Sequence, residues 1–494
     1  MREYIAVFDI GTSSVKGVLV DRSAAVTGDC SVPVNTYYGD NKEVEQSPSE
    51  WLEAVKKITD YWWRNTAVKP SEVTAVTFSG QMEDVIPIAD GKCDRAVLYS
   101  DTRAVEEAEY INKVCPDLAS KSGNTVKSST PLAKILWLKS HQQEIYHEAE
   151  SFVFSSKDFI IYKMTGRKVT DPVTASTTGM MNLKSGKWMP DLLNLFNIKK
   201  TVLPEILKPE ENTGFITDSA SDETGFLTTT KVLAGSGDAA ASTLGAGAVN
   251  KGDMYFYIGT TGWAAAVDTT IRDTAESVFV LSHMKTGMYI TIAPLLNAGN
   301  VHQWALDFLI GSSDTDRYEL FDSLVNESPP GSNNLLFLPY IHGERCPVHD
   351  HQAKGAFVGI SPTVNKSDFA RSVIEGICFS YKQIIEETLP LRSKKYINLI
   401  GGGAESTVWC QILSDITGEV IRVPAYSEYL TALGAASSAF IHNGWTEDYQ
   451  SFSESICADE SAIYYYPVEE NSELYSEQYK YFLNMYPGVK DIFY

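Results

Sequence analysis

Residues 4–20 read YIAVFDIGTSSVKGVLV, and this stretch predicts how the fold begins. An apolar run ends at Asp9, a tight turn follows at Gly11, and a second apolar, β-branched run begins at Val15. Two apolar runs joined by a short glycine turn are typical of a β-hairpin. We therefore expect a sheet that starts with this hairpin and carries a polar turn at its end.

The same pattern returns in the second half of the chain. Residues 254–267 read MYFYIGTTGWAAAV, again an apolar run, a Gly-Thr turn and a second apolar run. Tyr257 stands where the first copy has Asp9. Strand and helix patterns alternate around both copies, as in α/β proteins. The sequence therefore predicts a duplicated α/β fold with domains at residues 1–245 and 246–494.

Length and composition narrow the class of protein. A chain of 494 residues is too long to fold around a single hydrophobic core, so we expect two large domains. With 41 basic and 63 acidic residues, the net charge of −22 argues against nucleic acid or an anionic membrane as partner. The seven cysteines are scattered without a C-x-x-C pair, and no signal-peptide pattern or apolar run of ~20 residues is evident. We expect a cytoplasmic protein.

The two Gly-Thr turns suit phosphate binding. Glycine turns expose backbone N–H groups, and threonine and serine hydroxyls add donors for phosphate oxygens. Asp9 could hold Mg²⁺, which prefers oxygen ligands, and Lys16 could offset phosphate charge. A single turn of this kind is better explained as an ordinary hairpin turn. For the matched pair with its acid, both explanations stay open.

Residues 233–242, LAGSGDAAAS, predict a strand, a glycine turn and a helix. The spacing loosely matches a dinucleotide-binding loop, but Asp238 at the turn would repel a pyrophosphate. Asp238 could instead be a general base, which the helix dipole would keep ionised with a low pKa. The segment alone is better explained by a plain helix cap.

Three further segments could contact ligands. The glycines at 401–403 close a strand and open a helix, which would admit a flat adenosine or simply pack tightly. Gln81 to Asp84 and Asp101 to Arg103 each follow a strand, where α/β proteins bind ligands. These polar segments could bind sugar hydroxyls, although ordinary solvated loops have the same composition.

Taken together, these segments resemble the FGGY carbohydrate kinases over residues 4 to about 445. Further motifs support the resemblance: residues 128–138 (SSTPLAKILWL), 338–347 (LPYIHGERCP) and 355–375. The resemblance implies two ribonuclease H-like domains of the actin and hexokinase superfamily around a central cleft. It also implies an ATP-dependent kinase that uses Mg²⁺ and acts on a small sugar or polyol.

The resemblance implies roles for individual residues. Asp238 would be the catalytic base and contact the substrate, and Asp9 would be the metal-associated acid. The other residues on the sugar side would be Gln81, Met82, Glu83 and Asp101. The nucleotide would be bound by Gly11, Thr12, Ser13, Lys16, Gly259, Thr260, Thr261, Gly299, Gln303, Gly402, Gly403 and Thr407.

Within the family, Gly80-Gln81-Met82 and Asp101-Thr-Arg103 look most like xylulokinases. That likeness implies conversion of D-xylulose to D-xylulose 5-phosphate. Xylulokinases usually have histidine where this chain has Glu83, so ribulose, glycerol, erythritol and gluconate are alternative substrates, with the acid disfavouring gluconate. A non-catalytic sugar sensor is a more distant alternative, because Asp9, Asp238 and both turns are present. A protein-directed ATPase is also more distant, because it would leave the sugar-side segments and the family motifs unexplained. Because dimers are common in this family, the resemblance also implies a homodimer.

Overall fold

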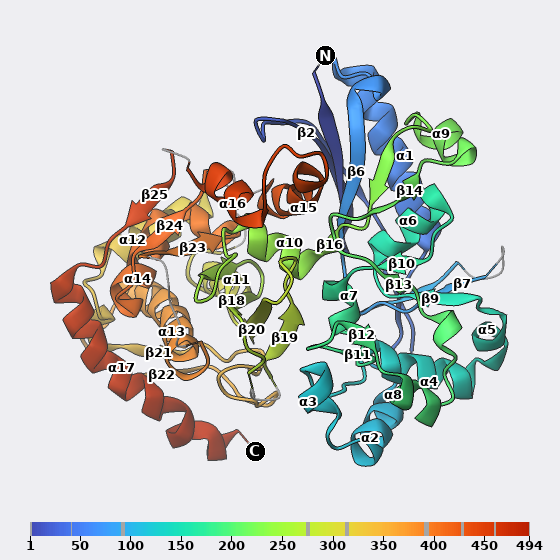
Figure 1. The fold of residues 1–494 in the computed structure, drawn as a ribbon. Helices are drawn as coiled ribbons and strands as arrows, with labels where there is room; N and C mark the ends of the chain where they lie inside the picture. The colour runs from blue at the N-terminus through green and yellow to red at the C-terminus, as the bar shows by residue number, and fades with distance from the viewer. Residues whose placement is uncertain are drawn as a thin grey trace.

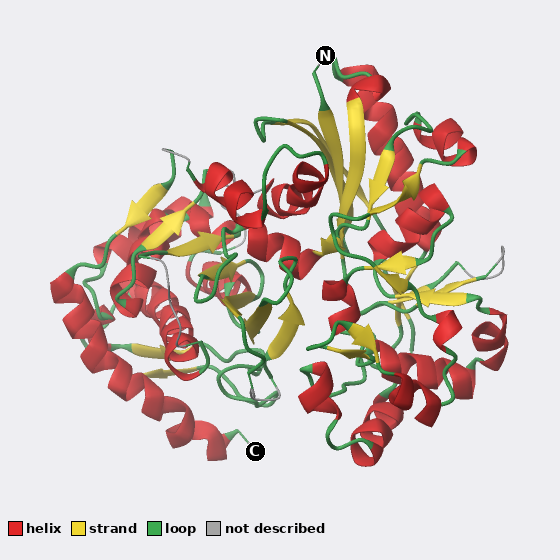
Figure 2. Cartoon of the chain, viewed as in Figure 1, coloured by secondary structure: helices red, strands yellow, loops and turns green. Residues whose placement is uncertain are grey.

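The computed structural model describes residues 2–40, 42–89, 94–272, 277–311, 316–389, 395–425, 429–458 and 461–493. Two α/β bodies lie side by side, the first running from blue to green and the second from green to red in Figure 1. Each body surrounds a sheet with helices (Figure 2). The predicted α/β class is confirmed.

The first sheet begins with the hairpin that residues 4–20 predict. Its strands, in order across the sheet, are β14 (Asn212–Phe215), β15 (Lys231–Leu233), β6 (Val73–Gly80), β1 (Tyr4–Ile10), β2 (Ser14–Asp21) and β3 (Val26–Pro33). The short strand β16 (Ser236–Gly237) pairs with the end of β6. β1, β6 and β15 run parallel, whereas the outer pairs are antiparallel.

The second sheet repeats this arrangement. Its strands, in order, are β19 (Phe279–Ser282), β20 (Tyr289–Leu295), β18 (Gly262–Asp268), β17 (Met254–Ile258), β23 (Ile397–Ile400), β24 (Ile421–Val423) and β25 (Ile463–Tyr465). From β20 to β25 the pairing directions match those from β3 to β14. The predicted duplication is confirmed, with one added edge strand, β19.

Helices cover the sheets and join the smaller hairpins. In the first half they are α1 (Pro48–Asn65), α2 (Val105–Val114), α3 (Leu118–Ser122), α4 (Pro131–His141), α5 (Gln143–Glu148), α6 (Ser156–Thr165), α7 (Pro172–Ser176), α8 (Pro190–Leu195) and α9 (Asp218–Thr224). In the second half they are α11 (Gly299–Leu309), α12 (Arg317–Glu327), α13 (Lys366–Glu387), α14 (Thr407–Thr417), α16 (Tyr449–Cys457) and α17 (Glu469–Val489). The short strands are β4 (Tyr37–Tyr38), β5 (Val44–Gln46), β7 (Ile86–Ile88), β8 (Ala96–Val97), β9 (Ser151–Val153), β10 (Val169–Thr170), β11 (Met181–Asn182), β12 (Lys187–Trp188), β13 (Glu205–Ile206), β21 (Leu336–Leu338) and β22 (Ala356–Val358).

The helix α1 shows how sequence pattern sets the packing. Trp51, Ile58 and Trp62 recur at helical spacing and are fully buried. Trp62 packs against Phe8 of β1, with ring centroids 5.1 Å apart. Among the described residues, no helix combines the length and apolarity that crossing a bilayer requires.

Two helices, α10 (Asp238–Gly245) and α15 (Leu430–His442), lie between the sheets (Figure 1) and share one apolar core with both. Their backbones touch, because a Cβ on Gly245 would lie 1.8 Å from the Leu430 carbonyl oxygen. α15 also contacts the first sheet, with Ser438 Oγ 2.9 Å from Thr77 Oγ1. A helix from the second half of the chain therefore packs on the first domain, and the border predicted at residue 245 falls at the end of α10.

Candidate active site

The two predicted catalytic carboxylates follow neighbouring strands of the first sheet. Asp9 of β1 pairs with Ser79 of β6, and Ser236 of β16 pairs with the same Ser79 from the other side. Asp238 comes two residues later, as the first residue of α10. Since parallel strands end at one edge of a sheet, Asp9 and Asp238 share that edge.

The pKa of Asp238 differs from the sequence prediction. Burial raises this pKa to about 7, and the charge of Asp9 adds to the rise. The N–H groups at the start of α10 favour the ionised form, but lost hydration and like charge are stronger. The prediction of a low pKa is wrong. A carboxylate that titrates near neutral pH is well matched to a general base. Burial also raises the pKa of Asp9.

Glycines fix the loop that carries Asp238. Gly235 has a φ of +62°, and a Cβ there would lie 2.3 Å from the Phe78 carbonyl oxygen, so the turn requires glycine. A Cβ on Gly237 would lie 2.3 Å from Sδ of Met82. The predicted sugar-side residue Met82 is buried and packs directly against the loop of the predicted base.

The first Gly-Thr turn closes as a hairpin. The Gly11 N–H donates to the Ser14 carbonyl at 3.1 Å. Ser13 and Lys16 are exposed, and Lys16 pairs in register with Asp9 across β1 and β2. The ammonium group of Lys16 therefore lies on the same face as the predicted metal-associated acid, Asp9, and its charge acts on that acid.

Gln81 connects this turn to the sugar-side segment. Thr12 Oγ1 donates to Gln81 Oε1 at 2.7 Å, and Gln81 Nε2 donates to Gln46 Oε1 at 3.1 Å. Gln81 is almost completely buried. Both polar atoms of its amide are thus bonded within the protein, and the residue positions the turn.

Glu83 has a left-handed φ of +61°, which is uncommon for a residue with a side chain and concentrates at functional sites. Burial raises its pKa to about 7, and the charges of Lys134, Lys127 and Arg345 oppose that rise. Arg345 is exposed and belongs to the second half of the chain. Its charge therefore reaches Glu83 from the opposite domain.

Two buried groups beside Glu83, Lys134 and Asp84, had no individual role in the sequence prediction. Lys134 Nζ donates to the carbonyl oxygens of Glu83, at 2.9 Å, and of Leu98. Burial lowers the pKa of Lys134 to about 8. Asp84 is fully buried, and its Oδ2 has no hydrogen-bond partner within the described residues. Lys134 belongs to the motif at residues 128–138. The sequence does not show that Lys134 and Asp84 are buried, and burial is what sets them apart from ordinary charged residues.

Asp101 holds a loop in place. It is fully buried, and its carboxylate accepts from the Arg103 guanidinium at 2.7–3.0 Å. Oδ2 also accepts from the Val44 N–H at 2.7 Å. Arg103 in turn bonds Glu45 at 2.7 Å. Both oxygens of this predicted sugar contact are engaged inside the protein.

The second Gly-Thr turn rests on the start of α11. The N–H groups of Gly299 and Asn300 donate to the carbonyls of Gly259 and Thr260 at 2.9 and 2.8 Å. A Cβ on Gly299 would lie 2.3 Å from the Gly259 oxygen, so this contact requires glycine. The turn opens onto a cavity of about 720 Å³.

That cavity gathers most of the predicted nucleotide residues of the second half. Its lining includes Gly259, Thr260, Gly299, Gln303, Gly402 and Gly403. Thr261 and Thr407 are exposed and stand outside this lining. One large cavity thus connects a phosphate-type turn with the glycines at 401–403. His302 and Asp322, which the sequence did not single out, also line it.

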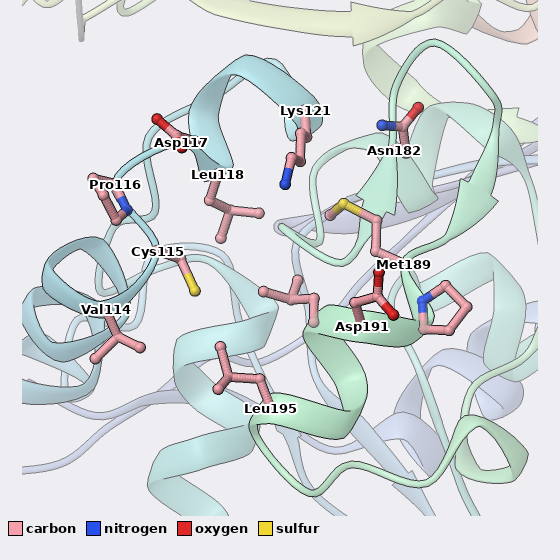
Figure 3. A pocket seen from close by; sticks show the side chains of 12 residues that line it. Val114, Cys115, Pro116, Asp117, Leu118, Lys121, Asn182, Met189, Asp191 and Leu195 are labelled. Carbon is pink, nitrogen blue, oxygen red and sulfur yellow. The ribbon is translucent and has the colours of Figure 1, made fainter.

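A separate cavity of about 480 Å³ lies in the first half of the chain (Figure 3). Lys121 points into it, and Cys115, Asp191 and Leu195 line it from the ends of α2 and α8. None of the predicted site residues is in its described lining. The predicted chemistry therefore lies elsewhere.

Family models match nearly the whole chain. The model for the N-terminal domain of the FGGY family of carbohydrate kinases matches residues 4–245, and the model for its C-terminal domain matches residues 254–442. A xylulose kinase of Staphylococcus xylosus is 30% identical over 98% of this chain and 99% of that protein.

Solved structures also align over nearly the whole chain. A gluconate kinase from Lactobacillus acidophilus aligns with a TM-score of 0.90 and 26% identity, covering 99% of this chain and 98% of that one. A ligand-bound xylulose kinase from the same organism aligns with a TM-score of 0.89 and 26% identity over the same shares. The predicted two-domain fold is confirmed.

Proposed function

The chain belongs to the FGGY family of carbohydrate kinases and is an ATP-dependent sugar kinase, and we propose that it phosphorylates a terminal hydroxyl of a neutral ketose, D-xylulose first. The observation that carries the proposal is the pair of carboxylates at one sheet edge, with Asp238 titrating near pH 7. At neutral pH such a group accepts a proton from the attacking hydroxyl as the bond to phosphorus forms.

The nucleotide would lie in the 720 Å³ cavity, with its phosphates toward the cleft. Gly259 and Thr260 at one end offer N–H and hydroxyl donors, and the Gly11–Ser13 turn offers the same from the first domain. Closure of the domains would exclude water from the transfer.

Mg²⁺ fits beside Asp9. Two carboxylates with raised pKa values share the edge, and a divalent cation would relieve their repulsion. Mg²⁺ bound with ATP supplies charge neutralisation of the phosphates. Asp9 would hold it, directly or through water, while Asp238 stays free to receive the proton.

The charge of Glu83 supports a neutral substrate. Glu83, whose pKa near 7 leaves it partly ionised at neutral pH, follows Met82, which packs on the Asp238 loop, whereas burial raises the pKa of Asp84 well above its ordinary value and favours its neutral form. A carboxylate-bearing sugar such as gluconate would meet like charge there, whereas a ketose offers hydroxyl donors. Ribulose, glycerol and erythritol are the neutral alternatives. A homodimer, a cytoplasmic location and the absence of a nucleic-acid partner stay predictions of the sequence.

Sugar-stimulated ADP release from Mg·ATP tests the proposal. The panel is D-xylulose, L-xylulose, D-ribulose, L-ribulose, glycerol, erythritol and gluconate. D-Xylulose should give the highest kcat/KM, with another neutral ketose as the nearest alternative. A response to gluconate alone would overturn the neutral-substrate proposal, and no response to any member would remove the assignment to these sugars.

A further inference from the structure

The helix α6 starts at the edge of the first sheet where the two predicted catalytic carboxylates lie. Ser156 Oγ donates to the Ile10 carbonyl at 2.8 Å, and Ile10 directly follows Asp9. A Cβ on Gly80, at the end of β6, would lie 2.8 Å from Ser156 Oγ and 3.0 Å from the backbone nitrogen of Lys157. The first turn of α6 therefore packs directly on the ends of β1 and β6.

Lys157, the second residue of α6, has a fully buried ammonium group. Its Nζ lies 2.7 Å from Asp158 Oδ1, 2.9 Å from Asp171 Oδ2 and 3.2 Å from the Ala234 carbonyl oxygen. Burial disfavours the charged form, but the charges and hydrogen bonds of the two acids outweigh it and raise the pKa of Lys157. An ammonium group has three N–H donors, so each donor of Lys157 has an acceptor inside the protein.

The bond to Ala234 acts on the loop that carries the proposed base. Ala234 is buried, and the next residue is Gly235, whose positive φ makes the turn toward Asp238. The Ala234 carbonyl belongs to the peptide plane that joins these two residues, so a donor that holds this oxygen also holds the start of the turn. A buried carbonyl needs such a donor. Lys157 thus restrains the segment that places Asp238.

Asp171 extends the same restraint to α7. Its Oδ1 accepts from the N–H groups of Val173 and Thr174 at 2.9 and 3.3 Å, so it caps this helix while its Oδ2 accepts from Lys157. Besides burial, the charge of Asp171 is one of the influences that raise the pKa of Asp238. The Lys157 ammonium offsets this charge at close range.

Stability alone does not account for this buried cluster, because apolar residues of similar volume often stabilise a fold as well as buried ions do. We propose that Lys157 is a positioning residue for catalysis, which holds the Asp238 loop in place through its bond to the Ala234 carbonyl. Since Lys157 is fully buried, it acts through the loop and not on the substrate. The inference rests on the proposed role of Asp238 as the base.

Lys157→Met combined with Asp158→Asn tests the inference, because the pair removes one cation and one acid together. Methionine keeps most of the side-chain stem and loses the donor to Ala234. The kcat on the best sugar should fall by about 10- to 100-fold, since a displacement of about 1 Å can cost a rate factor of that size. The KM for the sugar and the calorimetric affinity for ADP should stay within a few-fold of wild type.

Lys139→Met is the matched control. Lys139 Nζ also donates to a backbone carbonyl of the first domain, that of Phe196 at 2.9 Å, and neither residue is assigned to the site. This variant should leave kcat unchanged.

A second variant guards against misfolding of the first. Lys157→Gln keeps N–H donors for the two acids, but its amide ends one bond short of the ammonium position, and it should lower kcat in the same way. Thermal melting shows which variants are folded. Wild-type kcat in either folded variant would overturn the inference. Loss of the fold in both would assign Lys157 a purely structural role and would also overturn it.

Asp238→Asn separates this inference from the assignment of the base. In that background, the change at Lys157 should lower the residual kcat by less than about twofold, because the positioned carboxylate is already gone. An equal fall in both backgrounds would show that Lys157 acts elsewhere and would overturn the inference. Wild-type turnover in Asp238→Asn alone would instead remove the proposed base, and the inference with it.

Discussion

Asp9 at the end of β1 acts on Asp238 at the start of α10: after burial, its charge is the largest influence that raises the pKa of Asp238 to about 7. Asp9 lies in β1 and Asp238 directly follows β16, and these two strands pair with β6 from opposite sides. The acid that we assign to the metal therefore also tunes the proposed base.

This coupling predicts the pH dependence. A base works when deprotonated, so kcat/KM should rise with pH through a value near 7 and then level off. Asp9→Asn removes the neighbouring charge, so the rising limb should move to lower pH in the residual activity. Steady-state rates from pH 5 to 9 measure it. A limb that stays in place would show that Asp9 does not act on the titrating group.

Glu83 should govern discrimination against acidic sugars. Glu83→Gln removes the charge of a half-buried carboxylate, which should raise kcat/KM for gluconate by about tenfold relative to that for D-xylulose. The exposed Glu144 of α5 provides a matched control, since Glu144→Gln should leave the ratio unchanged. Competition assays with both sugars give the ratio. An equal ratio in all three proteins would contradict a role for the Glu83 charge.

The contact between α10 and α15 should be sensitive to a single methyl group. Gly245→Ala places a Cβ where the Leu430 oxygen lies, 1.8 Å away, and should lower the free energy of unfolding by about 1–3 kcal/mol. Gly488→Ala, in the open helix α17, should leave stability equal or raise it by up to about 1 kcal/mol. Urea titrations compare them. Equal stability of the two variants would show that α10 and α15 can move apart at Gly245 without a cost in stability, and would contradict the tight contact.

Local features of the site were predictable from sequence. Adjacent residues encode both Gly-Thr hairpins, the loop before Asp238 and the glycines at 401–403. The positive φ of Gly235 shows that the turn before Asp238 needs glycine. The repeated hairpin also predicted the repeated sheet, since each hairpin forms part of the sheet of its own half.

The environment of each side chain was not predictable. The pKa of Asp238 depends on burial and on Asp9, which the chain brings together only when β1 and β16 flank β6. The sequence shows that Gln81 and Asp101 are polar, but not that Thr12 and Arg103 already bond them. The sequence could not indicate His302, because its buried Nε2 is seen to lack a hydrogen-bond partner only once the side chains are packed.

Asp238→Asn tests the central claim most directly, with turnover and sugar binding measured on the same protein. The substitution keeps the size of the side chain and removes the proton acceptor. Turnover on the best sugar should fall by about 10³-fold or more, while calorimetry should show sugar affinity within a few-fold of wild type. Turnover near the wild-type rate would show that Asp238 is not the base and would contradict the mechanism proposed for this kinase.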